Sequence, residues 1–235
     1  MRSYYFFLSF SLLLSGVDYA QNNKANSKKS NELLTAVDSV ETPHKFNLDS
    51  IPLSPQSEML DEESYWKIIE NSLKETKNQE DQEMHLITAL EQLSPKEMIG
   101  FRLRTDKLLF DSYTSNLWCA DYVISNGTME EGFDYFRCWL ISRGKEAFYK
   151  TQENPDYLVN LVENEPKVYD FEGFWYVAVA AFKNTTNKDA ISYIDYEKFK
   201  TTDENYPILD FNWNVDDPKT MEKICPVLFQ KFWKK

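Results

Sequence analysis

Histidine, glycine and cysteine are scarce in this chain of 235 residues, which has two, six and three of them. His44 and His85 are far in the sequence from every cysteine, and the chain has no HExxH motif and no local signature of a Ser-His-Asp site. It also has no glycine-rich loop that would cradle a phosphate and no CxxC pair typical of zinc or redox sites. We therefore expect neither a cofactor nor a metal.

Long apolar runs are missing after residue 20, and no later stretch approaches the roughly 20 residues that a transmembrane helix needs. Residues 1–20, MRSYYFFLSFSLLLSGVDYA, place Arg2 before a short apolar run and end in a small residue. This pattern is typical of a secretory signal peptide. We expect cleavage after Ala20, or alternatively after Gly16. The mature chain is then periplasmic or extracellular and has no membrane span.

Basic side chains are outnumbered by acidic ones. The chain has 26 Lys and Arg against 38 Asp and Glu, which gives a formal net charge of -12. This excess of negative charge repels the phosphates of nucleic acids and the surface of anionic membranes. We expect no nucleic-acid partner, and the remaining partner class is a protein or another component of the cell envelope. The acidity is also explained simply by solubility.

The few cysteines leave the disulfide pairing open. An oxidising compartment would permit one disulfide among Cys119, Cys138 and Cys225, and three pairs are possible. Three buried thiols are equally compatible with the sequence, because a free cysteine packs like a small hydrophobic residue. The sequence does not choose among these alternatives.

The remaining composition predicts one helical domain behind a tether. Residues 21–60 mix Asn, Ser, Lys and Pro without a sustained hydrophobic period, which is typical of a flexible tether. From Asp61 onward, apolar residues recur at helical spacing, and residues 61–235 are predicted to form a mainly α domain of about seven helices. The tail carries large apolar residues such as Trp213 and Phe232, so we expect an irregular C-terminal segment that wraps back over the core.

Helix starts and weak strand signals can also be placed. Ser94, followed by Pro95, is a predicted N-cap, as are Ser115 and Asp170 for later helices. The stretches KVYDF and ISYID carry the only strand signals in this region, and both are weak. The fold is therefore predicted to be dominated by helices.

The centre of the chain resembles a known family. The run NLWCADYVISNGTMEEGFDYFRCWLISRGKEAFYKTQENPDYL, with SYWKIIE upstream and FWYVAVAAF and DDPKTMEKICPVLFQKFW downstream, is similar to the bacterial domain of unknown function 4240 family. The likeness covers roughly residues 62–233. It implies a compact helical domain without an assigned reaction. Members of the family carry two glycines, a cysteine and paired aspartates before the central helix, where this chain has NGTMEE and therefore no loop thiol.

Arg137 stands out in the central helix, GFDYFRCWLISRG. Phe133, Phe136 and Leu140 form one stripe at helical spacing, which predicts a buried face. Arg137 lies beside this stripe, and Trp139 and Arg143 flank its other side. A guanidinium in that position needs a partner, which Asp134 or Asp121 would supply as a structural ion pair. The functional alternative is an arginine that holds an anionic ligand against Trp139 or Trp118.

Two functions are compatible with these residues. The first is an exported, non-catalytic domain that binds its partner through Trp118, Tyr122 and the start of the central helix, because Trp and Tyr are favoured anchors at interfaces. The second is a hydrolase-like enzyme in which a cluster of carboxylates and an arginine surrounds a cleft. The acidic pair before Gly132 is also explained by the dipole at the start of the helix. The candidate site residues are Glu130, Glu131, Asp134, Arg137, Trp118, Tyr122, Asp121 and Trp139.

Overall fold

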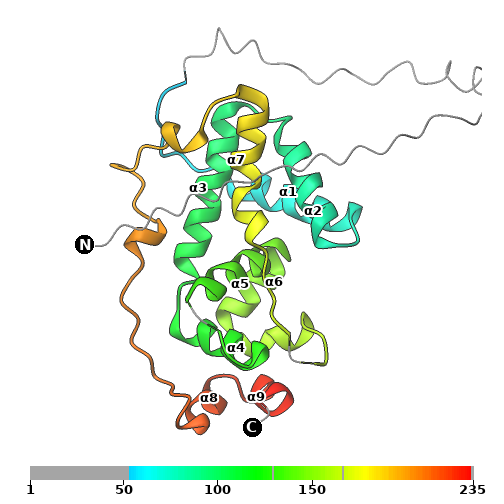
Figure 1. Ribbon diagram of the computed structural model, residues 1–235, viewed down its shortest axis with the longest axis vertical. Helices are drawn as coiled ribbons and strands as arrows, with labels where there is room; N and C mark the ends of the chain where they lie inside the picture. The colour runs from blue at the N-terminus through cyan, green and yellow to red at the C-terminus, as the bar shows by residue number, and fades with distance from the viewer. Residues whose placement is uncertain (1–52, 129, 166, 234–235) are drawn as a thin grey trace, which may run out of the picture. The chain divides into compact units, whose positions relative to one another are not determined.

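The fold is mainly α-helical, as the sequence predicts (Figure 1). The structure, a computed structural model, describes residues 53–128, 130–165 and 167–233. The predicted signal peptide and the predicted tether up to residue 52 lie outside the described residues. In the part of the chain that is described, no helix is both long and apolar enough to cross a membrane.

Helices follow one another along the whole described region. Nine α-helices are present there, two more than the approximate count expected from the sequence. The α-helices are α1 (Glu62–Glu75), α2 (Gln79–Leu90), α3 (Pro95–Asp111), α4 (Ser115–Ser125), α5 (Glu130–Ser142), α6 (Lys145–Glu153), α7 (Glu172–Thr186), α8 (Pro218–Ile224) and α9 (Pro226–Phe232). Short 3₁₀ turns are η2 (Pro155–Asn160), η3 (Ala190–Tyr193) and η4 (Asp203–Asn205).

Helix starts follow local chemistry, with corrections of one residue. Ser94 caps α3 as predicted, and Glu97 completes a capping box with it. The cap of α4 is Thr114 and not Ser115, because Thr114 has the extended backbone that an N-cap requires and its hydroxyl accepts a hydrogen bond from within the first turn. The N-cap of α7 is Phe171 and not the predicted Asp170, because the buried Phe171 ring anchors that end of the helix.

The two weak strand signals did not produce strands. Among the described residues there is no β-strand, and the ISYID stretch makes only an isolated parallel bridge between Ile194 and Gln56. A single bridge lacks the further hydrogen-bonded neighbours that stabilise a sheet.

The core forms around α3 and α7, which lie side by side, with α2 and α5 packed against α7 (Figure 1). Phe101 of α3 and Phe174 of α7 meet there with ring centroids 6.5 Å apart. The stripe predicted on the central helix is confirmed, because Phe133, Phe136 and Leu140 are completely buried. Burial of such apolar area is the main stabilising contribution to a domain of this kind.

The chain already packs onto the helices before Asp61. The Asp195 N–H donates to the carbonyl of Gln56 at 2.8 Å, and the Leu60 N–H donates to the carbonyl of Gly100 at 2.9 Å. A Cβ atom on Gly100 would lie 2.7 Å from the Leu60 nitrogen, so this close approach requires glycine. Residues 53–60 are therefore an integral part of the packed domain.

The C-terminal segment wraps back over the core, as predicted, and reaches α4 through α8 and α9 (Figure 1). The carboxylate of Asp156 accepts hydrogen bonds from the N–H groups of Val227 and Leu228, which begin α9. The indole N–H of Trp213 donates to the first carbonyl of α4 at 2.8 Å. Leu228 and Phe232 are buried against the domain. The segment is thus fixed by both polar and apolar contacts.

Candidate functional site

Arg137 is completely buried, and its guanidinium is bound on every side by the protein. Its Nε donates to the carbonyl of Phe133 at 3.3 Å. Its terminal nitrogens donate to the carbonyl of Leu109 on α3 and to the carboxylate of Asp134. Asp134, one turn earlier on α5, is therefore its ion-pair partner, which is the structural alternative described above. The donors of Arg137 are directed at protein atoms.

Three aromatic rings surround this buried charge. The guanidinium carbon lies 5.0 Å from the ring centroid of Tyr113, 4.7 Å from Phe133 and 4.8 Å from Tyr206. Tyr113 and Tyr206 also stack on each other, with centroids 4.2 Å apart. Aromatic faces attract a cation, and the attraction is strongest where water is excluded. The cage explains how the apolar core accepts an arginine.

The two glutamates at the start of α5 are exposed and have different surroundings. The Tyr113 hydroxyl donates to Glu130 at 2.9 Å. Burial, followed by this bond to a carboxylate, raises the pKa of Tyr113 to about 12. Glu131 lies in the same first turn, where a carboxylate interacts favourably with the helix dipole. Tyr113 therefore links Glu130 to Arg137, which in turn pairs with Asp134. None of these residues lines the cavities described below.

Asp121 is a buried acid of α4 that does not pair directly with Arg137. Its side chain is only 2 % exposed, and its Oδ2 atom has no hydrogen-bond partner. Burial raises the pKa of this carboxyl well above its usual range, although Thr128 and the charge of Arg137 oppose the shift. Burial therefore favours the neutral form of the Asp121 carboxyl over its charged form.

Trp118 and Tyr122, the predicted binding surface, are half-buried beneath the C-terminal segment. Trp118 stacks on Phe133 with centroids 4.8 Å apart and meets Phe211 edge-on. The Tyr122 ring centroid lies 5.5 Å from Trp213 and 6.0 Å from Trp233. A substantial part of each ring is used in packing within the chain.

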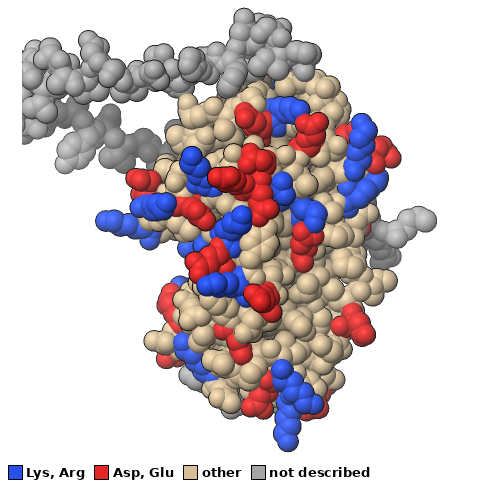
Figure 2. All heavy atoms as spheres, turned by 180° about the vertical axis from the view of Figure 1, so that it is seen from behind, with Lys and Arg blue, Asp and Glu red and all other residues tan. Residues whose placement is uncertain are grey.

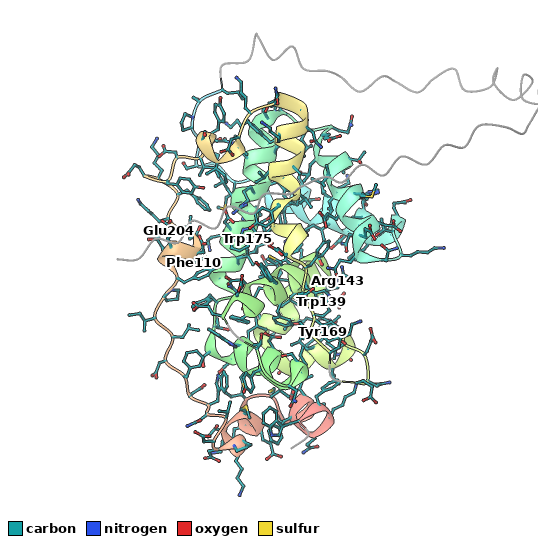
Figure 3. All side chains as sticks on the ribbon, viewed as in Figure 1. Phe110, Trp139, Arg143, Tyr169, Trp175 and Glu204 are labelled. Carbon is teal, nitrogen blue, oxygen red and sulfur yellow. The ribbon has the colours of Figure 1, made fainter. Side chains whose placement is uncertain are left out.

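A different cavity opens at the end of the central helix, with a volume of about 300 Å³. Trp139, Arg143 and Tyr169 lie close together there, beside α5 and α6 (Figure 3). The rings of Trp139 and Tyr169 have centroids 4.7 Å apart and are almost completely buried. Gln79 of α2 and Lys167 contribute polar side chains to the wall of this cavity. The exposed lining of the cavity is mainly polar, and convergent polar groups give a ligand site its specificity.

Arg143 is one of four charged residues that line this cavity, together with Lys167, Glu163 and Asp170. Its Nε and one terminal nitrogen donate to the hydroxyl of Ser142 at 3.1 and 2.9 Å, and the same terminal nitrogen donates to the amide oxygen of Gln82. These partners are neutral. Within the described ranges no carboxylate lies at ion-pair distance from Arg143, and burial alone lowers its pKa. The half-buried guanidinium is therefore without an ion-pair partner among the described residues, although Asp170 and Glu163 line the same cavity.

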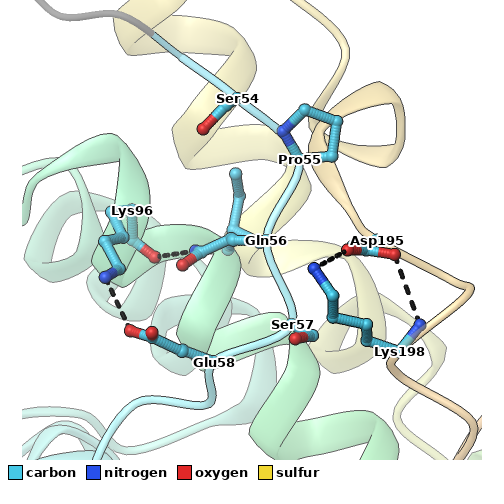
Figure 4. Close-up of a pocket in the computed structure, with 9 residues that line it drawn as sticks. Ser54, Pro55, Gln56, Ser57, Glu58, Lys96, Asp195 and Lys198 are labelled. Atoms are coloured by element: carbon cyan, nitrogen blue, oxygen red, sulfur yellow. Dashed lines mark hydrogen bonds and ion pairs between the residues drawn. The ribbon is translucent and has the colours of Figure 1, made fainter.

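Two further cavities share the mainly polar lining of the Arg143 cavity. One, of about 320 Å³, lies where residues 54–58 meet α3 and the turn after η3 (Figure 4). Its charges are already paired, because Lys96 binds Glu58 at 2.6 Å and Lys198 binds Asp195 at 2.9 Å. The other cavity, beside η2 and α9, contains the capping carboxylate of Asp156. Neither combines an unpaired charge with buried aromatic walls.

Surface charge adds no further candidate on the face shown in Figure 2. Lys and Arg side chains there are interspersed with Asp and Glu side chains, and the two signs lie next to each other over much of that face. Such a mixed surface gives no single-sign field that would attract a charged macromolecule. The cavity beside Trp139 is therefore the better supported site.

Only one of the eight residues predicted from the sequence, Trp139, lines the Arg143 cavity. The signal that would have found Arg143 is its position one helical turn after Trp139, on the same flank of the central helix. Tyr169 and Gln79 come from segments distant in the sequence, and the sequence contains no pattern that brings them together. Packing of α2 and of the chain before α7 against α5 creates the cavity.

These features define a compact, all-helical domain with a small aromatic cavity that contains one arginine. Residues 60–184 match the family described as protein of unknown function (DUF4240), and the chain belongs to that family. The match includes α1 to α6 and nearly all of α7, and hence Trp139, Arg143 and Tyr169, but not α8 and α9. No curated protein and no solved structure matches the chain.

Proposed function

We propose that this protein is an exported, non-catalytic binding domain that holds a carboxylate group in the cavity of Trp139, Arg143 and Tyr169. The partner that carries this carboxylate is a protein or another component of the cell envelope, the class that the acidic composition favours. The observation that supports the proposal best is the half-buried Arg143, whose partners in the described part of the chain are all neutral.

The electrostatics of Arg143 support an anionic ligand. A guanidinium loses hydration when it is buried, and a carboxylate that accepts two of its N–H groups restores both charge balance and hydrogen bonding. One terminal nitrogen of Arg143 already binds Ser142 and Gln82, which fixes the orientation of the planar group. The other terminal nitrogen has no hydrogen bond to the described residues, and it is the donor that a ligand would engage.

The aromatic wall supports a ligand with a flat or apolar body. Trp139 and Tyr169 line the cavity with the small part of each side chain that stays exposed, and the Lys167 ammonium lies 5.7 Å from the Tyr169 centroid, near the same opening. Glu163 pairs with Lys167 at 2.7 Å, so Lys167 adds little net positive charge. An aromatic carboxylate therefore fits the cavity better than a multiply charged anion does.

The hydrolytic alternative has weaker support. It requires Glu130, Asp134 and Arg137 to face a substrate, whereas Arg137 is completely buried and Asp134 is its ion-pair partner. A general acid or base must reach the atom to which it transfers a proton. The contacts of these residues are those of a packed helix.

Binding of benzoate by the full chain tests the proposal, with benzamide as the uncharged analogue. Titrations followed by nuclear magnetic resonance are expected to show benzoate shifting signals of Trp139 and Tyr169, while benzamide binds at least tenfold more weakly. Arg143→Gln should abolish the difference between the two probes. Lys219→Gln, which removes one positive charge from the exposed side of α8, is the matched control and should leave it unchanged. The proposal would be contradicted if benzoate and benzamide bound equally well to the original protein, or if Arg143→Gln kept the preference for benzoate.

A further inference from the structure

Cys119 and Cys225 meet where α4 packs against the C-terminal segment. Cys119 lies on the buried side of α4, and Cys225 separates α8 from α9; both side chains are completely buried. Helices α8 and α9, on either side of Cys225, both pack against α4, which carries Cys119. The neighbouring Cys119 thiol, followed by burial, raises the pKa of Cys225. The Cys225 thiol also reaches the carbonyl of Met221 at 3.6 Å.

Cys138 lies in different surroundings. It belongs to α5, is completely buried, and feels the charges of Arg137, Asp134, Arg102 and Asp106. Burial raises the pKa of Cys138, and the helix that carries it packs mainly against α3, α6 and α7. Of the three pairs that the sequence allows, the structure therefore brings together Cys119 and Cys225.

We propose that Cys119 and Cys225 form a disulfide that ties the C-terminal segment to α4, while Cys138 remains a thiol. The family match ends before Cys225, so the bond joins a segment outside the matched region to a helix within it. The ring contacts of Trp213 and Trp233 with Tyr122 hold the same two elements together. A disulfide at this position would reinforce an existing contact.

The reaction is a thiol–disulfide exchange with an external disulfide, either glutathione disulfide or an oxidoreductase of the exporting compartment. The thiolate of one cysteine attacks a sulfur of the external disulfide, which forms a mixed disulfide and releases one thiol. The thiolate of the second cysteine then attacks the protein sulfur of this mixed disulfide and releases the other thiol. The protein loses two S–H bonds and gains one S–S bond, and the external disulfide is reduced to two thiols.

Burial determines when this exchange takes place. Both thiols are inaccessible once the C-terminal segment has packed, and only an accessible thiolate reacts. The bond therefore forms during folding, before α8 and α9 dock on α4. The predicted export would bring the chain into an oxidising compartment at that stage. The disulfide is independent of any ligand beside Arg143, so the two proposals can fail separately.

Thiol mapping after refolding tests the pairing. The full chain is unfolded, refolded with reduced and oxidised glutathione, alkylated with iodoacetamide in denaturant, digested and analysed by mass spectrometry. We expect a linked peptide pair containing Cys119 and Cys225, with Cys138 alkylated. Three alkylated cysteines, or a linkage that includes Cys138, would overturn the proposal.

Thermal unfolding provides the second measurement. Residues 119 and 225 enclose almost half of the chain, and a loop of that size gives a large constraint on the unfolded state, so dithiothreitol should lower the melting temperature of the oxidised protein by roughly 10 °C. Cys138→Ser should retain this shift, and Cys225→Ser should lose it. If Cys225→Ser does not fold, the linked peptide in Cys138→Ser decides the question on its own.

Discussion

The guanidinium of Arg137 lies 4.8 Å from the ring centroid of Tyr206, a residue beyond the end of the family match. The C-terminal segment therefore closes one side of a charge that the central helix carries into the core. Tyr206 in turn stacks on Tyr113, which also faces the guanidinium. The segment that wraps the domain and the buried arginine thus depend on each other for packing.

Replacing Arg137 with methionine is expected to lower the free energy of unfolding by about 3 kcal/mol or more. Methionine keeps much of the apolar stem, but it leaves Asp134 without its ion-pair partner and removes one donor from each of the carbonyl groups of Phe133 and Leu109. Urea denaturation of the two proteins under the same conditions measures the loss. Unchanged or higher stability would instead indicate that the charge is retained for a purpose other than folding.

A double mutant isolates the contribution of the ion pair. Arg137→Met combined with Asp134→Asn removes both charges, so part of the loss should be recovered relative to Arg137→Met alone. Asp134→Asn by itself should be destabilising, because it leaves the fully buried guanidinium without a counter-charge. Strictly additive losses would show that the two side chains do not interact.

The buried carboxyl of Asp121 makes stability depend on pH. Its pKa is raised in the folded protein, whereas an unfolded aspartate titrates near ~3.9. At pH values between these two pKa values, the folded state binds more protons than the unfolded state. The contribution of Asp121 to the free energy of unfolding is therefore complete below pH ~3.9 and is lost as the pH rises towards the folded pKa. Asp121→Asn should therefore be more stable than the original at pH 7, by about 1 kcal/mol or more, and gain little below pH 4.

Comparing the two proteins across pH separates Asp121 from other acids. The pKa values of Asp106 and Asp134 are also raised, but both carboxylates face an arginine and are the same in the variant and the original. Only the difference between the two unfolding curves is assigned to Asp121. A difference that stays constant from pH 4 to pH 8 would mean that Asp121 is ionised in the folded state.

The sequence predicts the helical fold better than it predicts the Arg143 cavity. The spacing of Phe133, Phe136 and Leu140 identifies a buried helix face, because such a stripe has a local period. The cavity at Arg143 has no local period, since Gln79 and Tyr169 reach it only after α2 and the chain before α7 have packed against α5. Tertiary packing, and not the local pattern, decides which arginine faces a cavity.

The same reason explains Trp118 and Tyr122. On an isolated helix Trp118 and Tyr122 lie opposite the apolar stripe, so the sequence predicts that they form a binding surface. Trp213 and Trp233, distant in the sequence, cover Tyr122 in the folded chain, and Phe211 contacts Trp118. The wrapping of the tail was predicted from its aromatic content, but the rings that it covers were not.

Removing the Trp213 side chain should loosen the C-terminal segment. Trp213→Ala deletes the ring contact with Tyr122 and the indole hydrogen bond to α4, with an expected loss of about 2 kcal/mol in unfolding free energy. Limited trypsin digestion should then cut after Lys219 or Lys223 sooner than in the original protein. Ile208→Ala is the matched control, because that side chain of the same segment is fully exposed and its loss should change neither measurement. Equal digestion rates in all three proteins would show that other contacts hold the segment.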